Sequence, residues 1–119
     1  MTPDRLGYRC IVVRQAAIPS QPEKTLTLRM IKETVAGVTR ASIHDLDGPY
    51  RRADLARARM IYYWVARRLT SKGMPLIGHY CGGRDHSTVS YGFLRVERDR
   101  LAFEPELSRV MAVLKAEAF

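Results

Sequence analysis

The sequence predicts an all-α fold, a compact helical bundle that contains a helix-turn-helix. Apolar residues recur at helical spacing in several segments, glycine and proline breakers separate those segments, and residues that cap helices precede them. With 119 residues, of which 46% are hydrophobic, the chain is large enough for one domain with a modest core. We expect a helix-turn-helix domain over residues 25–119 and a partly ordered N-terminal arm over residues 1–24.

The arm carries few signals of packed structure. Its one short apolar run, Cys10 to Val13, would be a lone strand with nothing to pair with. The N-terminus has no apolar signal core, and no stretch approaches the ~20 apolar residues of a membrane span. Cys10 and Cys81 are too few for a disulfide framework. We therefore expect a cytoplasmic protein that does not enter the membrane.

The first helix is expected from about residue 25 to residue 39, with Thr25 or Thr27 as its cap. Its apolar positions recur at helical spacing: Leu28, Ile31, Val35 and Val38. A short turn over residues 42–46 follows, and the breaker Asp47-Gly48-Pro49 closes it.

A second long helix is expected over residues 52–70. Its predicted buried stripe consists of Ala58, Ile61, Tyr62, Val65 and Leu69. The basic residues Arg57, Arg59, Arg67 and Arg68 are expected to project mostly off that stripe. The aromatic run Tyr62-Tyr63-Trp64 could stack on bases, as in single-strand binders, but inside a helix we expect it to pack in the core.

A short helix is expected over residues 75–81, with Pro75 in its first turn and the pair Gly82-Gly83 at its end. Asp85 then caps the next helix by accepting the backbone N–H of Ser87 or Thr88. The apolar face of that helix consists of Val89, Gly92, Phe93 and Val96, with Gly92 predicted at a close helix-helix contact. A last helix over residues 105–118 presents Leu107, Val110, Met111 and Leu114.

A short helix, a glycine turn and a second helix with small polar residues at its start are typical of a helix-turn-helix, whose second helix enters the major groove of DNA. The residues expected to face outward are His86, Ser87, Ser90, Tyr91 and Leu94. Charge supports a polyanionic partner, because residues 50–100 hold 11 basic and 4 acidic residues, whereas the remainder holds 9 and 8.

Three runs of residues resemble one known family. They are Arg67-Arg68-Leu69-Thr70, then Met74-Pro75-Leu76-Ile77-Gly78, and then Gly82-Gly83-Arg84-Asp85-His86-Ser87-Thr88-Val89. Together they resemble the C-terminal DNA-binding domain of the bacterial replication initiator DnaA, over about residues 26–114. The last of the three runs is highly specific to that domain.

The resemblance implies double-stranded DNA as the partner, at an asymmetric A/T-rich box of the TTATCCACA type, with one monomer per site. It implies base contacts in the major groove from Asp85, His86, Ser87 and Thr88, with Arg84 in the same run counted among the DNA-binding residues. It also implies that Arg57 enters the adjacent minor groove and that Arg95 touches phosphate. Met74 and Pro75 would contact the DNA backbone and thymine methyls.

The chain departs from the family pattern at a few positions. Cys81 stands where the family usually has an aromatic residue, and Ala58 and Met60 stand where it usually has proline and glutamine. These departures leave the base preference open. Full initiators also carry an AAA+ ATPase module, and the 119 residues contain no phosphate-cradling G-x-x-x-x-G-K-[ST] loop. We expect a DNA-reading module used alone, with no nucleotide and no cofactor.

Metal binding and hydrolysis are two other functions that residues of this region could suggest. His79, Cys81 and His86 lack a fourth metal ligand, and no strained nucleophile turn or carboxylate orients Ser87, Thr88 and His86 for hydrolysis. We therefore expect no metal site and no enzyme. The alternative to DNA binding is a protein-interaction adaptor that keeps the fold, with RNA binding as a lesser variant. Both replication control and transcription regulation stay open as roles.

Overall fold

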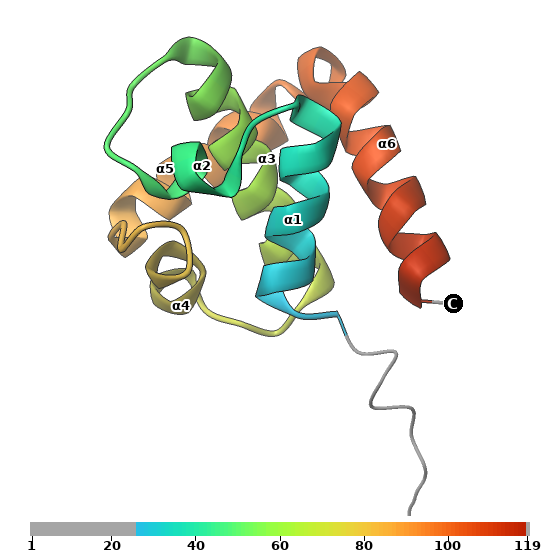
Figure 1. The fold of residues 1–119 in the computed structure, drawn as a ribbon, viewed down its shortest axis with the longest axis horizontal. Coiled ribbons are helices and arrows are strands. Elements are labelled where there is room, and N and C mark those ends of the chain that lie inside the picture. Colours follow the sequence, from blue (N-terminus) through green and yellow to red (C-terminus); the bar gives the residue numbers. More distant parts are fainter. Residues whose placement is uncertain (1–25, 119) are drawn as a thin grey trace, which may run out of the picture.

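In the computed structural model, residues 26–118 are described, with side chains to residue 115, and every regular element in that range is an α-helix. The predicted all-α class is confirmed, whereas the arm predicted over residues 1–24 lies outside the described residues. Figure 1 shows the arrangement of the helices. They are α1 (Leu28–Thr39), α2 (Ile43–Asp47), α3 (Ala53–Leu69), α4 (Met74–His79), α5 (His86–Arg98) and α6 (Arg100–Ala118). Among them is no helix with the length and apolar character to cross a membrane.

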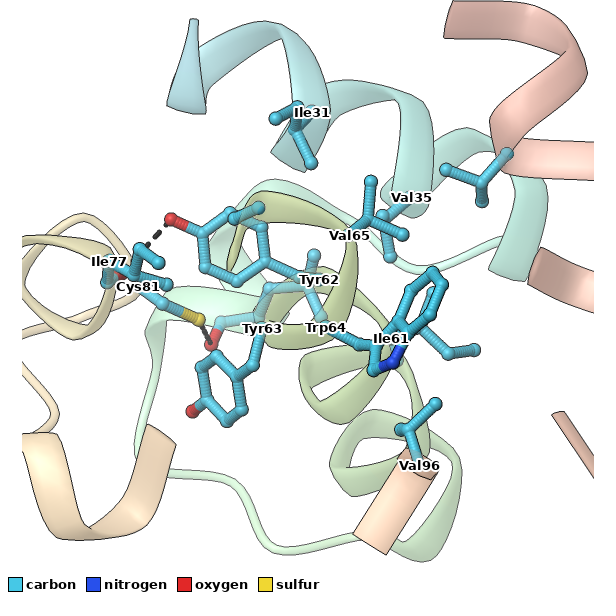
Figure 2. Packing of buried hydrophobic residues seen from close by; sticks show 14 of the residues in the cluster. Ile31, Val35, Ile61, Tyr62, Tyr63, Trp64, Val65, Ile77, Cys81 and Val96 are labelled. Atoms are coloured by element: carbon cyan, nitrogen blue, oxygen red, sulfur yellow. Dashed lines mark hydrogen bonds between the residues drawn. The ribbon is translucent and has the colours of Figure 1, made fainter. Parts of the chain in front are cut away.

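Helix α3 is the central element, and the other five helices all contact it. Its residues 61–66 are all buried, so this stretch has no solvent-facing side. The aromatic run Tyr62-Tyr63-Trp64 is at most 5% exposed, which confirms that it packs in the core (Figure 2). The Tyr62 hydroxyl also donates to the Ile77 carbonyl at 3.0 Å. The core helix thereby anchors the first helix of the helix-turn-helix.

The ends of the helices follow local capping rules. Thr27 caps α1 by accepting the Met30 N–H at 3.1 Å, so the second of the two predicted caps is the one in use. The turn predicted over residues 42–46 is instead a short helix, α2. Ser42 caps α2 and accepts the Asp45 N–H at 2.9 Å. That capping bond explains why the segment closes a helical turn.

The last helix begins five residues earlier than the sequence indicates. It starts at Arg100, and Pro105 lies inside it rather than at its first turn. Pro105 has no N–H, so α6 lacks one backbone hydrogen bond at this point, to the carbonyl of Leu101. The earlier start adds Phe103, which is 5% exposed, to the predicted apolar face.

Two basic side chains are buried and hold the α2 region in place. The prediction that Arg59 projects off the buried stripe is wrong, because only 7% of the residue is exposed. Its guanidinium donates to the carbonyls of four residues at 2.8–3.1 Å: Asp45, Leu46, Gly48 and Tyr50. Lys32 of α1 is 8% exposed, and its Nζ contacts both carboxylate oxygens of Asp47 and the Tyr80 carbonyl. In this region buried cations, rather than apolar side chains, pack against a segment rich in backbone carbonyls.

Gly92 marks the closest approach of α5 to α3, as predicted. A Cβ built on it would lie 2.6 Å from Cδ2 of the buried Tyr63 and 3.2 Å from Cγ of Met60. A Cβ at the helical Gly37 would meet nothing within 4 Å. The two glycines therefore form a matched pair for substitution.

We expect Gly92→Ala to destabilise the domain by about 1–2 kcal/mol, because overpacking outweighs the gain in helix propensity. Gly37→Ala gains the same propensity without a clash, so it should stabilise the domain by up to about 1 kcal/mol. Urea unfolding of both variants measures the difference. Equal changes in the two variants would show that α5 does not press on α3 at Gly92.

Candidate nucleic-acid interface

The turn between α4 and α5 is fixed by three glycines. Gly82 and Gly83 both have φ of +75°, a conformation that a residue with a Cβ adopts only under strain. Gly78 accepts the N–H groups of both Cys81 and Arg84 at 3.0 and 2.9 Å. A Cβ on Gly78 would overlap the Arg84 carbonyl, so the turn folds directly onto α4. The predicted left-handed glycine at the end of the short helix is confirmed.

Asp85 caps the second helix, as predicted. Its Oδ1 accepts the Thr88 N–H at 3.0 Å, and its backbone is extended. This hydrogen bond from Thr88 holds the pKa of the Asp85 carboxyl below its usual range. The carboxylate is therefore ionised at neutral pH, and it remains exposed beside the start of α5.

The first turn of α5 faces solvent. His86, Ser87 and Thr88 are all exposed, whereas Val89 is completely buried. Further along the same helix, Tyr91 is 60% exposed and Leu94 is 56% exposed. Of the residues predicted to face outward, only Ser90 is half-buried. An exposed, polar first turn on a rigid, capped helix is the geometry that reaches base edges in a major groove.

Three further predicted site residues lie at the start of α4 and further along α5. Met74 is half-buried and Pro75 is exposed, and both lie at the start of α4. Arg95 lies on α5, two turns beyond the exposed first turn, and pairs with Asp99 at 3.0 Å. The pair uses Nε of Arg95, and 43% of the side chain is exposed.

Arg84 is turned toward the protein. It donates to the carbonyls of Cys81 and Gly48, each at 2.6 Å. The second of these carbonyls is also an acceptor for Arg59. Arg84 thus fastens the glycine turn to the chain that follows α2. These hydrogen bonds of Arg84 fix the shape of the turn from which α5 begins.

Arg57 lies inside α3 and is bound to α6. Its Nε and Nη2 pair with the two carboxylate oxygens of Glu106 at 3.1 and 2.9 Å, and Nη2 also donates to the Ala102 carbonyl. The guanidinium carbon lies 4.4 Å from the centre of the Phe103 ring. Ala58 stands at the position of the family's usual proline, and unlike proline it keeps the N–H that a continuous helix from Ala53 uses. The predicted minor-groove arginine is therefore held one turn inside a helix.

The residues considered for a metal site do not converge. Cys81 is completely buried, and its thiol donates to the Leu46 carbonyl at 3.7 Å. Burial raises the pKa of this thiol, so it stays protonated as a core residue. His79 and His86 are both exposed. Over the described residues 26–118, no group of three His, Cys, Asp or Glu side chains is placed to hold a metal ion.

The sequence analysis missed the roles of Arg59 and Lys32, because each contacts carbonyls far away in the sequence. It also left Arg51 unassigned. Arg51 is exposed on the loop that Arg59 and Arg84 hold beside the glycine turn. The signal in the sequence was its position two residues after the Asp47-Gly48-Pro49 breaker.

Comparison with known proteins decides the family. A sequence model described as "Bacterial dnaA protein helix-turn-helix" matches residues 28–96, more than half of the chain. The chain belongs to this family of DnaA helix-turn-helix domains. The match begins at the first residue of α1 and ends two residues before the end of α5, so it includes α4, the glycine turn and most of α5.

Several similar proteins are named chromosomal replication initiator protein DnaA. The one from Synechococcus is 37% identical over 106 residues, which covers 84% of this chain and 22% of the relative. The one from Ruegeria pomeroyi is 35% identical over 79 residues, 66% of this chain and 17% of the relative. The one from Oenococcus oeni is 41% identical over 70 residues, 59% and 16% respectively. The chain spans about a fifth of the length of these relatives.

Proposed function

We propose that this domain binds double-stranded DNA at specific A/T-rich sites of the TTATCCACA type and acts in the control of replication initiation or of transcription. The observation that carries the proposal is the exposed first turn of α5, capped by Asp85 and held on a turn whose Gly82 and Gly83 have the left-handed backbone that glycine favours. A rigid helix start can place short side chains at base edges with little loss of conformational freedom on binding.

In this proposal the first turn of α5 reads bases. Ser87 and Thr88 carry hydroxyls that donate or accept at either kind of base pair, and His86 adds a ring nitrogen. Asp85 uses one carboxylate oxygen for the Thr88 N–H, so its other oxygen can accept from a cytosine amino group. Each of these groups is exposed in the free protein.

The surroundings position the DNA backbone. The start of α5 favours a phosphate, because its N–H groups and helix dipole are both directed there. Met74 and Pro75 at the start of α4 approach the backbone and thymine methyls, and Arg95 meets a phosphate further along the groove. Arg57 enters the minor groove in this proposal, and Arg84 keeps the turn in shape. One monomer occupies one asymmetric site.

A titration of two duplexes tests the proposal. The domain should bind a duplex with a TTATCCACA box at least about tenfold more tightly than a scrambled duplex of equal composition, a low margin for a specific binder. Affinity should also fall steeply with salt, since each phosphate contact adds roughly −0.9 to the slope of log K against log salt. Equal affinities with a nearly flat salt response would contradict DNA binding and support the adaptor alternative.

A further inference from the structure

The contact between Arg57 and α6 has a consequence for DNA affinity that rests on the proposed function. The start of α3 lies at the same end of the molecule as the start of α5. Gly92 of α5 meets Met60 of α3, and one turn or more further along both helices Glu97 pairs with Arg68 at 2.8 Å. The two helices therefore run in the same general sense. Arg57 lies about one turn before Met60 on α3, toward the end at which α5 begins.

At this position Arg57 is not available to DNA as the structure stands. Its guanidinium meets an ionised carboxylate, a backbone carbonyl and an aromatic face, all from residues 102–106 of α6. An arginine in a narrow minor groove must direct the same guanidinium N–H groups toward the DNA. The two sets of contacts exclude one another.

We propose that Glu106 is an affinity-determining residue of this domain, because it competes with the DNA minor groove for the Arg57 side chain. The pair is open enough to exchange, with 38% of the Arg57 side chain and 25% of the Glu106 side chain exposed. Ion pairs at this level of exposure are weak, whereas A/T-rich minor grooves concentrate negative potential. Binding at an A/T-rich flank therefore releases Arg57 from α6, and the strength of the Glu106 contact sets part of the cost.

The matched control lies on the same helix. Glu104 carries the same charge two residues earlier and accepts a hydrogen bond from Ser108 at 2.8 Å, on the exposed side of α6. Glu104→Gln removes one negative charge without touching Arg57. Glu106→Gln removes the same charge and replaces the carboxylate partner with a neutral amide. The difference between the two variants isolates the contact with Arg57 from the general effect of charge on DNA binding.

The experiment measures DNA affinity for wild type, Glu104→Gln and Glu106→Gln, and for the same three proteins with Arg57→Ala added. Each protein is titrated with two duplexes that contain the box, one with A·T flanking pairs and one with G·C flanking pairs. At one fixed salt concentration, Glu106→Gln should bind the A·T-flanked box about three- to tenfold more tightly than Glu104→Gln. The gain should disappear in the Arg57→Ala background and with the G·C flank. A gain equal to that of Glu104→Gln, or one that survives Arg57→Ala, would overturn the inference.

A second variant tests the inference if Glu106→Gln destabilises the domain. If Glu106→Gln lowers the midpoint of thermal unfolding by more than a few degrees, Glu106→Asp takes its place, because aspartate keeps the charge but withdraws it from Arg57. That variant should bind at least about twofold more tightly than wild type, and no gain would overturn the inference. If the proposed function itself is wrong, wild type will not prefer the box over a scrambled duplex. That result is distinguishable from a failure of the inference about Glu106.

Discussion

Replacing Arg59 with methionine is expected to lower the free energy of unfolding by about 3 kcal/mol. Methionine keeps the unbranched apolar part of arginine but not its guanidinium, so four carbonyls of the α2 region lose this donor. The Asp45 and Tyr50 carbonyls are then left with no side-chain donor, whereas the Gly48 carbonyl keeps Arg84 and the Leu46 carbonyl keeps the Cys81 thiol. Each buried polar group left without a partner costs about 1–3 kcal/mol, and part of the loop can recover hydrogen bonds to water. For a domain whose total stability is about 5–15 kcal/mol, this is a large loss.

Urea unfolding of Arg59→Met and of Arg109→Met measures this effect. Arg109 is exposed on α6, and its replacement should change stability by no more than about 0.5 kcal/mol. Arg59→Lys should fall between the two, because one ammonium cannot replace a guanidinium that spans four carbonyls. A loss below about 1 kcal/mol for Arg59→Met would show that water satisfies those carbonyls and that Arg59 does not hold the loop.

The helix-turn-helix could be predicted from the sequence because its determinants are local. The left-handed backbone at Gly82 and Gly83, the cap at Asp85 and the close contact at Gly92 each depend on the residue type at one position. The periodicity of Val89 and Val96 then orients the helix, which leaves His86 and its neighbours exposed.

What the sequence did not predict depends on distant partners. Arg59 follows directly after a stripe residue, and nothing in its neighbours shows that carbonyls 9 to 14 residues away will bury it. Arg57 is turned by α6, 45 to 49 residues further along the chain. Pro105 favours a helix start, but the helix begins at Arg100 and continues through the proline, which removes a single backbone bond. The minor-groove assignment of Arg57 remains a prediction.

Removing the two hydroxyls of the first turn of α5 is expected to have the largest effect on DNA recognition. Ser87→Ala and Thr88→Ala should each weaken binding to the box by on the order of 1–3 kcal/mol. The loss on random DNA should be much smaller, because these side chains read bases while phosphate contacts hold any sequence. Both variants keep the backbone N–H of Thr88 that Asp85 accepts, so this capping bond remains.

The measurement that tests the central claim most directly is a titration of wild type, Ser87→Ala, Thr88→Ala and Ser108→Ala against box and random duplexes at one salt concentration. Ser108 is an exposed serine on α6 and is not among the residues proposed to contact DNA, so its variant removes a hydroxyl outside that set. We expect the two α5 variants to lose affinity for the box and to approach the random duplex, while Ser108→Ala behaves as wild type. If the α5 variants weaken both duplexes equally, or weaken neither, the first turn of α5 does not read bases.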